Sequence, residues 1–169
     1  MAIGKAELFA FLAQMDIAVK TVEHEPLFTV AQSQALRGQI PGGHTKNLFL
    51  KDKKDNYFLL TVDEEAEIDL KQIHKAIGAA SRVSFGKAEA MESLLGVTPG
   101  AVTAFGVIND KAGAVRFFID ESLLSHEVIN CHPLVNTATT SIAPADLIRF
   151  IEATGHRPNT LNLAAQIAN

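Results

Sequence analysis

Residues 42–54, GGHTKNLFLKDKK, concentrate polar groups at the start of a predicted buried strand. Residues 48–50 have the bulk and β-propensity of a strand in the protein core. Two glycines, a histidine, a threonine, a lysine and an asparagine come directly before them. Because a strand held in the core is rigid, it can fix such groups in position. Lys46, with Asn47 beside it, is therefore suited to bind an anion or a carbonyl group, although a lysine before a buried strand can equally extend only into solvent.

Three lysines follow this strand within four residues: Lys51, Lys53 and Lys54. Such a cluster of positive charge can bind a polyanion such as RNA. A charged, solvated hairpin turn accounts for the same residues, because runs of charge commonly face water. Both interpretations stay open at this point.

A second segment, residues 96–106, holds three glycines and a proline between predicted core elements. Glycines allow a ligand to approach the main chain closely, and clustered N–H groups can bind a phosphate or an ester carbonyl. An ordinary turn between a helix and a strand would have the same composition. His132, directly before Pro133 at the end of a predicted strand, can offer a ring nitrogen to a ligand or to the backbone.

The other reactive residues argue against several classes of site. The six histidines show none of the short spacings of zinc sites, so no metal or other cofactor is expected. The chain has neither a Gly-x-Ser-x-Gly motif nor a phosphate-binding P-loop. Cys131 is next to His132, but neighbours on a strand point to opposite faces, so this pair is not expected to be a catalytic dyad. Cys131 is expected to be a small buried hydrophobe.

The composition favours one globular domain spanning residues 1–169, with 47% hydrophobic and 20% charged residues. A single cysteine excludes an intrachain disulfide and favours a reducing compartment. No run approaches the roughly 20 apolar residues that span a bilayer, so a cytoplasmic protein without a membrane partner is expected. The formal charge of −4 argues against indiscriminate nucleic-acid binding, although a local basic patch could still bind RNA.

Hydrophobic periodicity and turn residues predict the elements that position these groups. Strands 47–51 and 57–62 flank the lysine-rich turn and are predicted to form a hairpin. Strands 105–108 and 114–119 are predicted to be joined by a tight turn. This order favours an α/β (α+β) fold, with helices packed around a mixed sheet, over a doubly wound parallel fold. The predicted helices are 3–15, 29–37, one that starts at Asp69, 87–95 and 144–153, and the other predicted strands are 17–22, 81–85, 128–130 and 137–142.

Four segments of the chain resemble one known family. They are HEPLFTVAQ at 24–32, TKNLFLKDKK at 45–54, LGVTPGAVTAFGVIND at 95–110 and CHPLVNTAT at 131–139. Together, and in this order, they resemble the YbaK/ProX family of aminoacyl-tRNA editing proteins. Within it the chain is most similar to the free-standing prolyl-tRNA editing branch, ProXp-ala (PrdX). The resemblance implies a curved mixed sheet with helices around it, and a deacylase that removes alanine from mischarged tRNA(Pro) without a cofactor.

The resemblance also assigns residues. The family's invariant lysine and the asparagine beside it fall on Lys46 and Asn47. Its GxxxP loop falls on residues 100–104, from Gly100 to Ala104, and its pocket histidine falls on His132. Ala104 stands where the family usually has proline, which puts the rigidity of this loop in question.

An aminoacyl ester is already activated, so a site need only orient water, stabilise the oxyanion and exclude the wrong acyl group. The resemblance implies that Lys46 holds the terminal adenosine's phosphate or the scissile carbonyl, and that N–H groups of the loop at residues 100–104 face the ester. In the family, the free 2′-hydroxyl of the terminal adenosine is thought to help position the water.

Selectivity and partners follow from the same substrate. One methylene in an apolar pocket is worth only about 1–3 kcal/mol, so a second sieve sized for alanine must exclude proline by clash. Leu27, Phe28 and His132 are candidate walls, although Leu27 and Phe28 also fit an ordinary core. The lysine cluster, Lys51, Lys53 and Lys54, is the candidate grip on the acceptor stem of tRNA(Pro), which would make binding sensitive to salt. Prolyl-tRNA synthetase is a further candidate partner, and a monomer is the default.

Three alternatives remain. A sibling deacylase would remove cysteine or another small amino acid from a different tRNA. A non-catalytic module would bind aminoacyl-tRNA or a synthetase without turnover. A small-molecule hydrolase without an RNA partner would be indifferent to tRNA and to salt.

Overall fold

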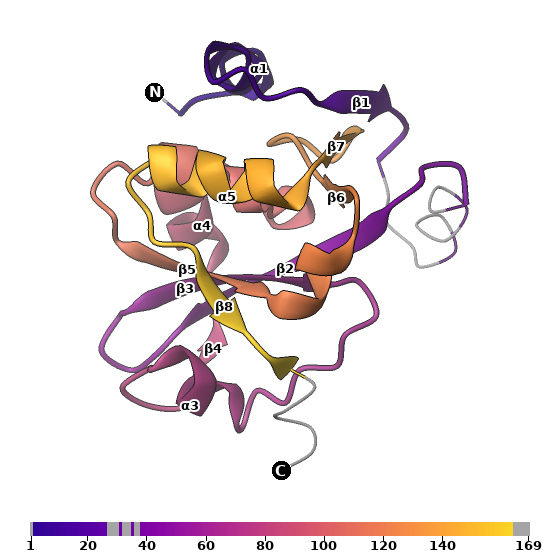
Figure 1. The fold of residues 1–169 in the computed structure, drawn as a ribbon. Helices are drawn as coiled ribbons and strands as arrows, with labels where there is room; N and C mark the ends of the chain where they lie inside the picture. Colours follow the sequence, from indigo (N-terminus) through magenta and orange to yellow (C-terminus); the bar gives the residue numbers. More distant parts are fainter. Residues whose placement is uncertain (1, 27–30, 32–34, 36–37, 164–169) are drawn as a thin grey trace.

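The computed structural model describes residues 2–26, 31, 35 and 38–163, whose strands form one mixed sheet with helices on both faces (Figure 1). The sheet order is β1-β7-β6-β2-β3-β5-β8, with β4 paired to β2. The predicted α/β fold class is confirmed. The strands are β1 Lys20–Glu23, β2 Gly43–Lys51, β3 Tyr57–Asp63, β4 Ser84–Phe85, β5 Val115–Asp120, β6 Ile129–Cys131, β7 Ala138–Ile142 and β8 Asn159–Leu161. The helices are α1 Lys5–Gln14, α3 Ile73–Ile77, α4 Ala88–Leu95 and α5 Pro144–Ala153, with 3₁₀ turns η1 Pro99–Ala101, η2 Ala104–Asn109 and η3 Glu121–Ser125.

Strand β2 connects the two halves of the sheet. It pairs antiparallel with β3 along most of its length, from Thr45 to Lys51. On its other edge it pairs with β6 only at Gly43 and His44, and with β4 only at Leu50 and Lys51. No strand of the described chain therefore pairs with that edge over residues 45–49.

The two faces of the sheet have separate cores, as the alternation of side chains along a strand requires. Phe49 packs in the core beneath α1, α4 and α5, whereas Leu50 packs in the core beside α3. In the first core, Phe105 contacts Phe150 edge to face, with 5.3 Å between ring centroids.

The predicted hairpin of β2 and β3 is confirmed, and a buried carboxylate fixes its lysine-rich turn. Asp52 accepts hydrogen bonds from the amides of Lys54, Asn56 and Ala80 and from the Asn56 side chain, at 2.9–3.0 Å. Burial alone would raise the pKa of Asp52, but these hydrogen bonds outweigh it and lower the pKa to about 2. The carboxylate is therefore ionised at neutral pH, and it ties the turn to the segment that precedes β4.

The predicted strand 105–108 is wrong, because these residues belong to the 3₁₀ turn η2. A short apolar run is compatible with either a buried strand or a buried helix. Here the Thr103 side chain caps the turn by accepting from the Phe105 amide at 3.3 Å. No hairpin therefore joins this segment to β5, and Asp110 instead turns the chain.

Most other predicted elements are confirmed with shifted ends. The predicted helices 3–15, 87–95 and 144–153 correspond to α1, α4 and α5, and Gly96 ends α4 with a left-handed φ of 68°. The strand predicted at 81–85 is reduced to β4, and the one at 17–22 begins only at Lys20. The helix expected to start at Asp69 begins at Ile73, after a turn. The predicted helix 29–37 lies largely outside the described residues. None of the described helices has the length and apolar character needed to cross a bilayer.

Candidate active site

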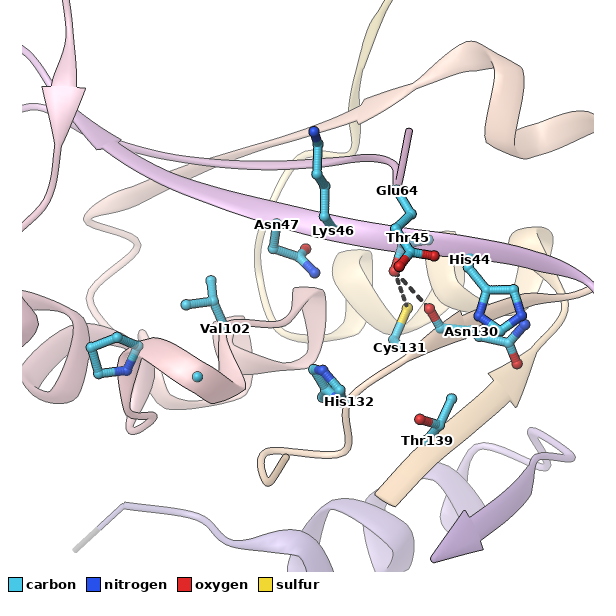
Figure 2. Close-up of a pocket in the computed structure, with 12 residues that line it drawn as sticks. His44, Thr45, Lys46, Asn47, Glu64, Val102, Asn130, Cys131, His132 and Thr139 are labelled. Atoms are coloured by element: carbon cyan, nitrogen blue, oxygen red, sulfur yellow. Dashed lines mark hydrogen bonds between the residues drawn. The ribbon is translucent and has the colours of Figure 1, made fainter. Parts of the chain in front are cut away.

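A cavity of about 250 Å³ lies between β2, the η1 turn and the connection from β6 to β7 (Figure 2). Ligand cavities commonly measure about 300–1,000 Å³, so this one suits a small group. Its walls carry polar side chains from segments far apart in the sequence. The lining residues are His44, Thr45, Lys46, Asn47, Glu64, Pro99, Gly100, Val102, Asn130, Cys131, His132 and Thr139.

Four residues predicted from the sequence meet at this cavity: Lys46, Asn47, Gly100 and His132. Figure 2 shows Asn47 and His132 directed toward one another from facing walls, whereas the ammonium group of Lys46 points away from both. Adjacent residues of a strand project to opposite faces, which accounts for the difference between Lys46 and Asn47. The cavity is thus built around Asn47 and His132.

The orientation of the Asn47 amide is fixed from behind by Thr61 of β3. The two residues are register partners, and the fully buried Thr61 hydroxyl donates to Asn47 Oδ1 at 2.6 Å. With its oxygen held in this way, Asn47 directs its NH₂ group into the cavity (Figure 2). Asn47 therefore presents a hydrogen-bond donor of fixed direction.

The main chain of Asn47 adds a second donor on the same side. In an antiparallel pair, residues that exchange backbone hydrogen bonds alternate with residues that do not. Glu64 N donates to His44 O at 2.9 Å, so the even-numbered residues of β2 are the ones bonded to β3. The odd-numbered residues point their N–H and C=O groups to the other edge, as the bond from Gly86 N to Phe49 O confirms. Because neither β4 nor β6 reaches Asn47, its peptide N–H faces the gap that the cavity occupies.

His132 supplies an acceptor on the facing wall. Its Nδ1 lies 3.2 Å from the carbonyl oxygen of Ala138, and since a carbonyl only accepts, Nδ1 carries the proton. Burial lowers the pKa of His132 below its ordinary value and outweighs the opposing hydrogen bond to the Ala138 carbonyl, and the electrostatic effects of His24 and Glu64 are smaller and opposite in sign. The ring is therefore neutral at pH 7, and its Nε2 lone pair is free to accept a hydrogen bond.

One hydrogen bond of the Lys46 ammonium group has a structural role. Its Nζ donates to the carbonyl of Ala66 at 2.5 Å and so holds the segment that follows β3 against β2. An ammonium group has three donors, so two N–H groups of Lys46 remain for another partner at the rim.

The predicted loop of residues 100–104 faces the cavity only in part. Pro99, Gly100 and Val102 line it, but Ala104 is fully buried in the core and does not. The prediction that Ala104 belongs to the reactive surface is therefore wrong. Ala104 is the first residue of η2, a position at which proline and alanine are both accommodated, so the turn keeps its shape without the proline.

The other predicted contacts lie elsewhere. The lysine cluster is at the far end of β2, where Lys51 is about 17 Å along the strand from Lys46. Lys51 pairs with Asp55 at 3.4 Å on the surface, and Lys53 and Lys54 are exposed. Leu27 and Phe28 lie outside the described residues.

Several lining residues were not predicted from the sequence. Cys131 is a protonated thiol at neutral pH and not a thiolate nucleophile. Burial raises its pKa to about 11, although a hydrogen bond from Thr45 acts in the opposite direction. Asn130 donates to the carbonyls of Pro41 and Gly43 and holds the start of β2 against β6. Thr139 bonds to His24 across 115 residues of sequence. In the described part of the chain, no group of three histidine, cysteine or acidic residues could hold a metal ion.

A family model and several known proteins are similar to this chain in sequence, and their names all refer to aminoacyl-tRNA editing or to prolyl-tRNA synthetase. The family model described as "Aminoacyl-tRNA editing domain" matches residues 24–150. The mouse protein "Prolyl-tRNA synthetase associated domain-containing protein 1" is 38% identical over 162 residues, covering 94% of this chain and 95% of the relative. "Prolyl-tRNA editing protein ProX" from Acetoanaerobium sticklandii is 30% identical over 161 residues, covering 95% and 98%.

A solved structure described as a candidate trans-editing enzyme for prolyl tRNA synthetase shares the fold. It superposes with a TM-score of 0.69 at 19% identity, and the match covers 96% of this chain and 99% of that one. The order of helices and strands around the cavity is thus that of a known fold.

Proposed function

The chain belongs to the aminoacyl-tRNA editing domain family, and we propose that it is a trans-acting deacylase that removes alanine from mischarged tRNA(Pro). One observation carries the proposal: donors at Asn47 face an acceptor at His132 across a cavity of about 250 Å³. That arrangement suits the hydrolysis of a small aminoacyl ester. The relatives named for prolyl-tRNA editing and for association with prolyl-tRNA synthetase support tRNA(Pro) as the tRNA.

The proposed reaction needs no nucleophilic side chain. Water adds to the ester carbonyl carbon, and the negative charge that develops on the carbonyl oxygen is stabilised by the Asn47 side-chain and main-chain N–H groups. The bond to the ribose oxygen then breaks and that oxygen takes up the remaining proton of the attacking water, which releases alanine and tRNA with a free hydroxyl. His132 Nε2 can accept a hydrogen bond while this happens. Cys131, protonated at neutral pH, takes no part.

Alanine is the proposed acyl group because the cavity is small, at about 250 Å³, and strands and the η1 turn form its walls. Val102 and Pro99 line one side, and we propose that these side chains exclude the larger prolyl group by clash. Exclusion by clash is more selective than the loss of one favourable contact. Cysteine or another small amino acid is the competing substrate, and a panel of mischarged tRNAs distinguishes them.

The acceptor end of the tRNA would extend from the cavity along β2 toward Lys51, Lys53 and Lys54. Each strand of duplex DNA advances about 3.4 Å per nucleotide, so a stacked strand of similar rise would need about five nucleotides to span the roughly 17 Å between Lys46 and Lys51. Phosphate contacts at these lysines would make binding weaker at higher salt. Prolyl-tRNA synthetase is the proposed source of the mischarged tRNA, in the cytoplasm.

The test is release of alanine from Ala-tRNA(Pro) by the wild-type protein and by Lys46→Ala, with Pro-tRNA(Pro) as the control. We expect the wild type to hydrolyse only the alanyl ester. Lys46→Ala should lose about tenfold or more of the rate. The substitution removes the hydrogen bond that holds the Ala66 segment, and it removes the proposed charge-assisted contact between the Lys46 ammonium group and the substrate. If the wild type leaves Ala-tRNA(Pro) intact while binding it tightly, the protein is a binding module and not a deacylase.

The rate should fall in acid, because His132 is an acceptor only when neutral. Burial holds its pKa below the ordinary value of 6.5, so the neutral form prevails near pH 7 and is lost as pH drops through the lowered pKa. Single-turnover rates from about pH 5 to about pH 8, corrected for uncatalysed hydrolysis, should show this acid limb. His132→Gln should lack the limb, and an unchanged limb in that variant would contradict the assignment.

A further inference from the structure

The wall that faces Asn47 carries a second acceptor, the hydroxyl of Thr139. Both Thr139 and His132 line the cavity, and Figure 2 shows them on the same wall. The direction in which each of their protons points can be derived from backbone carbonyls, which only accept hydrogen bonds.

His24 sets the direction of the Thr139 hydroxyl proton. His24 Nδ1 lies 2.8 Å from the carbonyl oxygen of Glu25, so Nδ1 carries a proton. In the neutral ring, Nε2 is then an acceptor, and it lies 2.8 Å from Thr139 Oγ1. The single hydroxyl proton of Thr139 is used in this bond. The lone pairs of Thr139 Oγ1 that remain can only accept.

The cavity is therefore polarised. Donors at Asn47 occupy one wall, and the acceptors His132 Nε2 and Thr139 Oγ1 occupy the other. A group that fits the second wall must donate more than one hydrogen bond and needs no acceptor. A primary ammonium group, with three donors and no acceptor, has this character.

We propose that His132 Nε2 and Thr139 Oγ1 form a subsite for the free α-ammonium group of the aminoacyl ester, with His24 as the residue that positions the Thr139 hydroxyl. This inference rests on the proposed deacylase function. It adds which group of the aminoacyl ester faces each wall of the cavity. The carbonyl carbon and the ammonium nitrogen of an amino acid are separated by one carbon atom. A substrate held between the two walls directs its carbonyl oxygen to Asn47 and its ammonium group to Thr139.

The test compares Ala-tRNA(Pro) with lactyl-tRNA(Pro), in which a hydroxyl replaces the ammonium group at nearly the same size. Each rate is divided by that of uncatalysed hydrolysis, because the ammonium group also activates the ester. The wild type should prefer the alanyl ester about tenfold or more, the range of a charge-assisted hydrogen bond. Thr139→Val should reduce this preference toward one, and Thr139→Ser should restore it.

Thr21→Val is the matched control. It removes a hydroxyl that bonds to Thr140 at 2.8 Å on the neighbouring strand pair, outside the cavity, so the preference should stay at the wild-type value. Equal hydrolysis of both esters by the wild type, or an unchanged preference in folded Thr139→Val, would overturn the subsite.

A binding measurement separates this inference from the proposed function. RNA minihelices that end in 3′-amino-adenosine, acylated with alanine or with lactic acid, cannot release their acyl group as an ester does. If the wild type hydrolyses neither ester, the deacylase proposal fails. Tighter calorimetric binding of the alanyl than of the lactyl minihelix would still support the ammonium subsite, and equal binding would refute it.

Discussion

Replacing Asn47 with alanine is expected to lower the single-turnover rate of alanine release about 100-fold or more. Loss of one preorganised donor to a developing oxyanion commonly costs about 10²–10³ in rate. The Asn47 side chain is such a donor, because Thr61 fixes its oxygen at 2.6 Å and leaves the NH₂ group in the cavity. The main-chain N–H of residue 47 remains in the variant, so a measurable residual rate is expected.

Thr61→Val tests whether the orientation of the Asn47 amide matters, because the variant keeps the amide and removes only the hydroxyl that orients it. Valine keeps the shape of threonine but cannot hold Asn47 Oδ1, so the amide is free to rotate. We expect a loss of about tenfold, smaller than in Asn47→Ala, with rescue by Thr61→Ser. Asn56→Ala, at the turn of the same hairpin, is the matched control and should change the rate little once folded. A full rate in Asn47→Ala would remove this residue from the reaction.

The largest effect on stability is expected for Asp110→Ala, a loss of about 3–5 kcal/mol in the free energy of unfolding. Asp110 is buried, and its carboxylate accepts from the amides of Ala114 and Val115 and from His156 Nε2, at 2.8–3.0 Å. The imidazole of His156, also buried, bonds to Thr154 through Nδ1 at 2.9 Å. Alanine at 110 would leave the buried Val115 amide and the buried His156 ring without their acceptor, together with the amide of the exposed Ala114.

Thermal and urea unfolding followed by circular dichroism check this prediction, and a fall in Tm of roughly 10 °C is expected. Glu23→Ala is the control, because it breaks an exposed ion pair with Lys5 at 3.2 Å and should cost less than about 1 kcal/mol. Asp110 does not line the cavity, so the rate per folded molecule should remain near wild type. Equal stability of the two variants would contradict the structural role of the Asp110 network.

Local sequence patterns predicted the elements whose limits are set by nearby residues. Gly96 and the Pro144 start of α5 mark helix ends within one turn, and the hairpin of β2 and β3 has its turn residues between its strands. The prediction at 105–108 was wrong because burial on all sides removes the periodicity that separates a strand from a helix. Only packing between distant helices decides that case.

The candidate site was predicted only in part, because its geometry also depends on packing between segments that are distant in the sequence. Lys46, Asn47 and His132 follow from the family resemblance, but neighbours on a strand cannot both project into one cavity. Which of them does so depends on where β6 and β7 pack, and those strands lie more than 80 residues later in the chain. Thr61 and His24 were missed because their contacts, with Asn47 and Thr139, appear only after strands have paired.

The unpaired edge of β2 has an evolutionary consequence. A peptide N–H is present in every residue except proline, so the main-chain donor at position 47 is encoded by the order of strands and not by any single codon. Under the proposed deacylase function, point mutations could alter the walls, and with them the acyl group that is accepted, without deleting this donor. A lineage built on this sheet could then change its substrate while it inherits the proposed main-chain contact to the oxyanion.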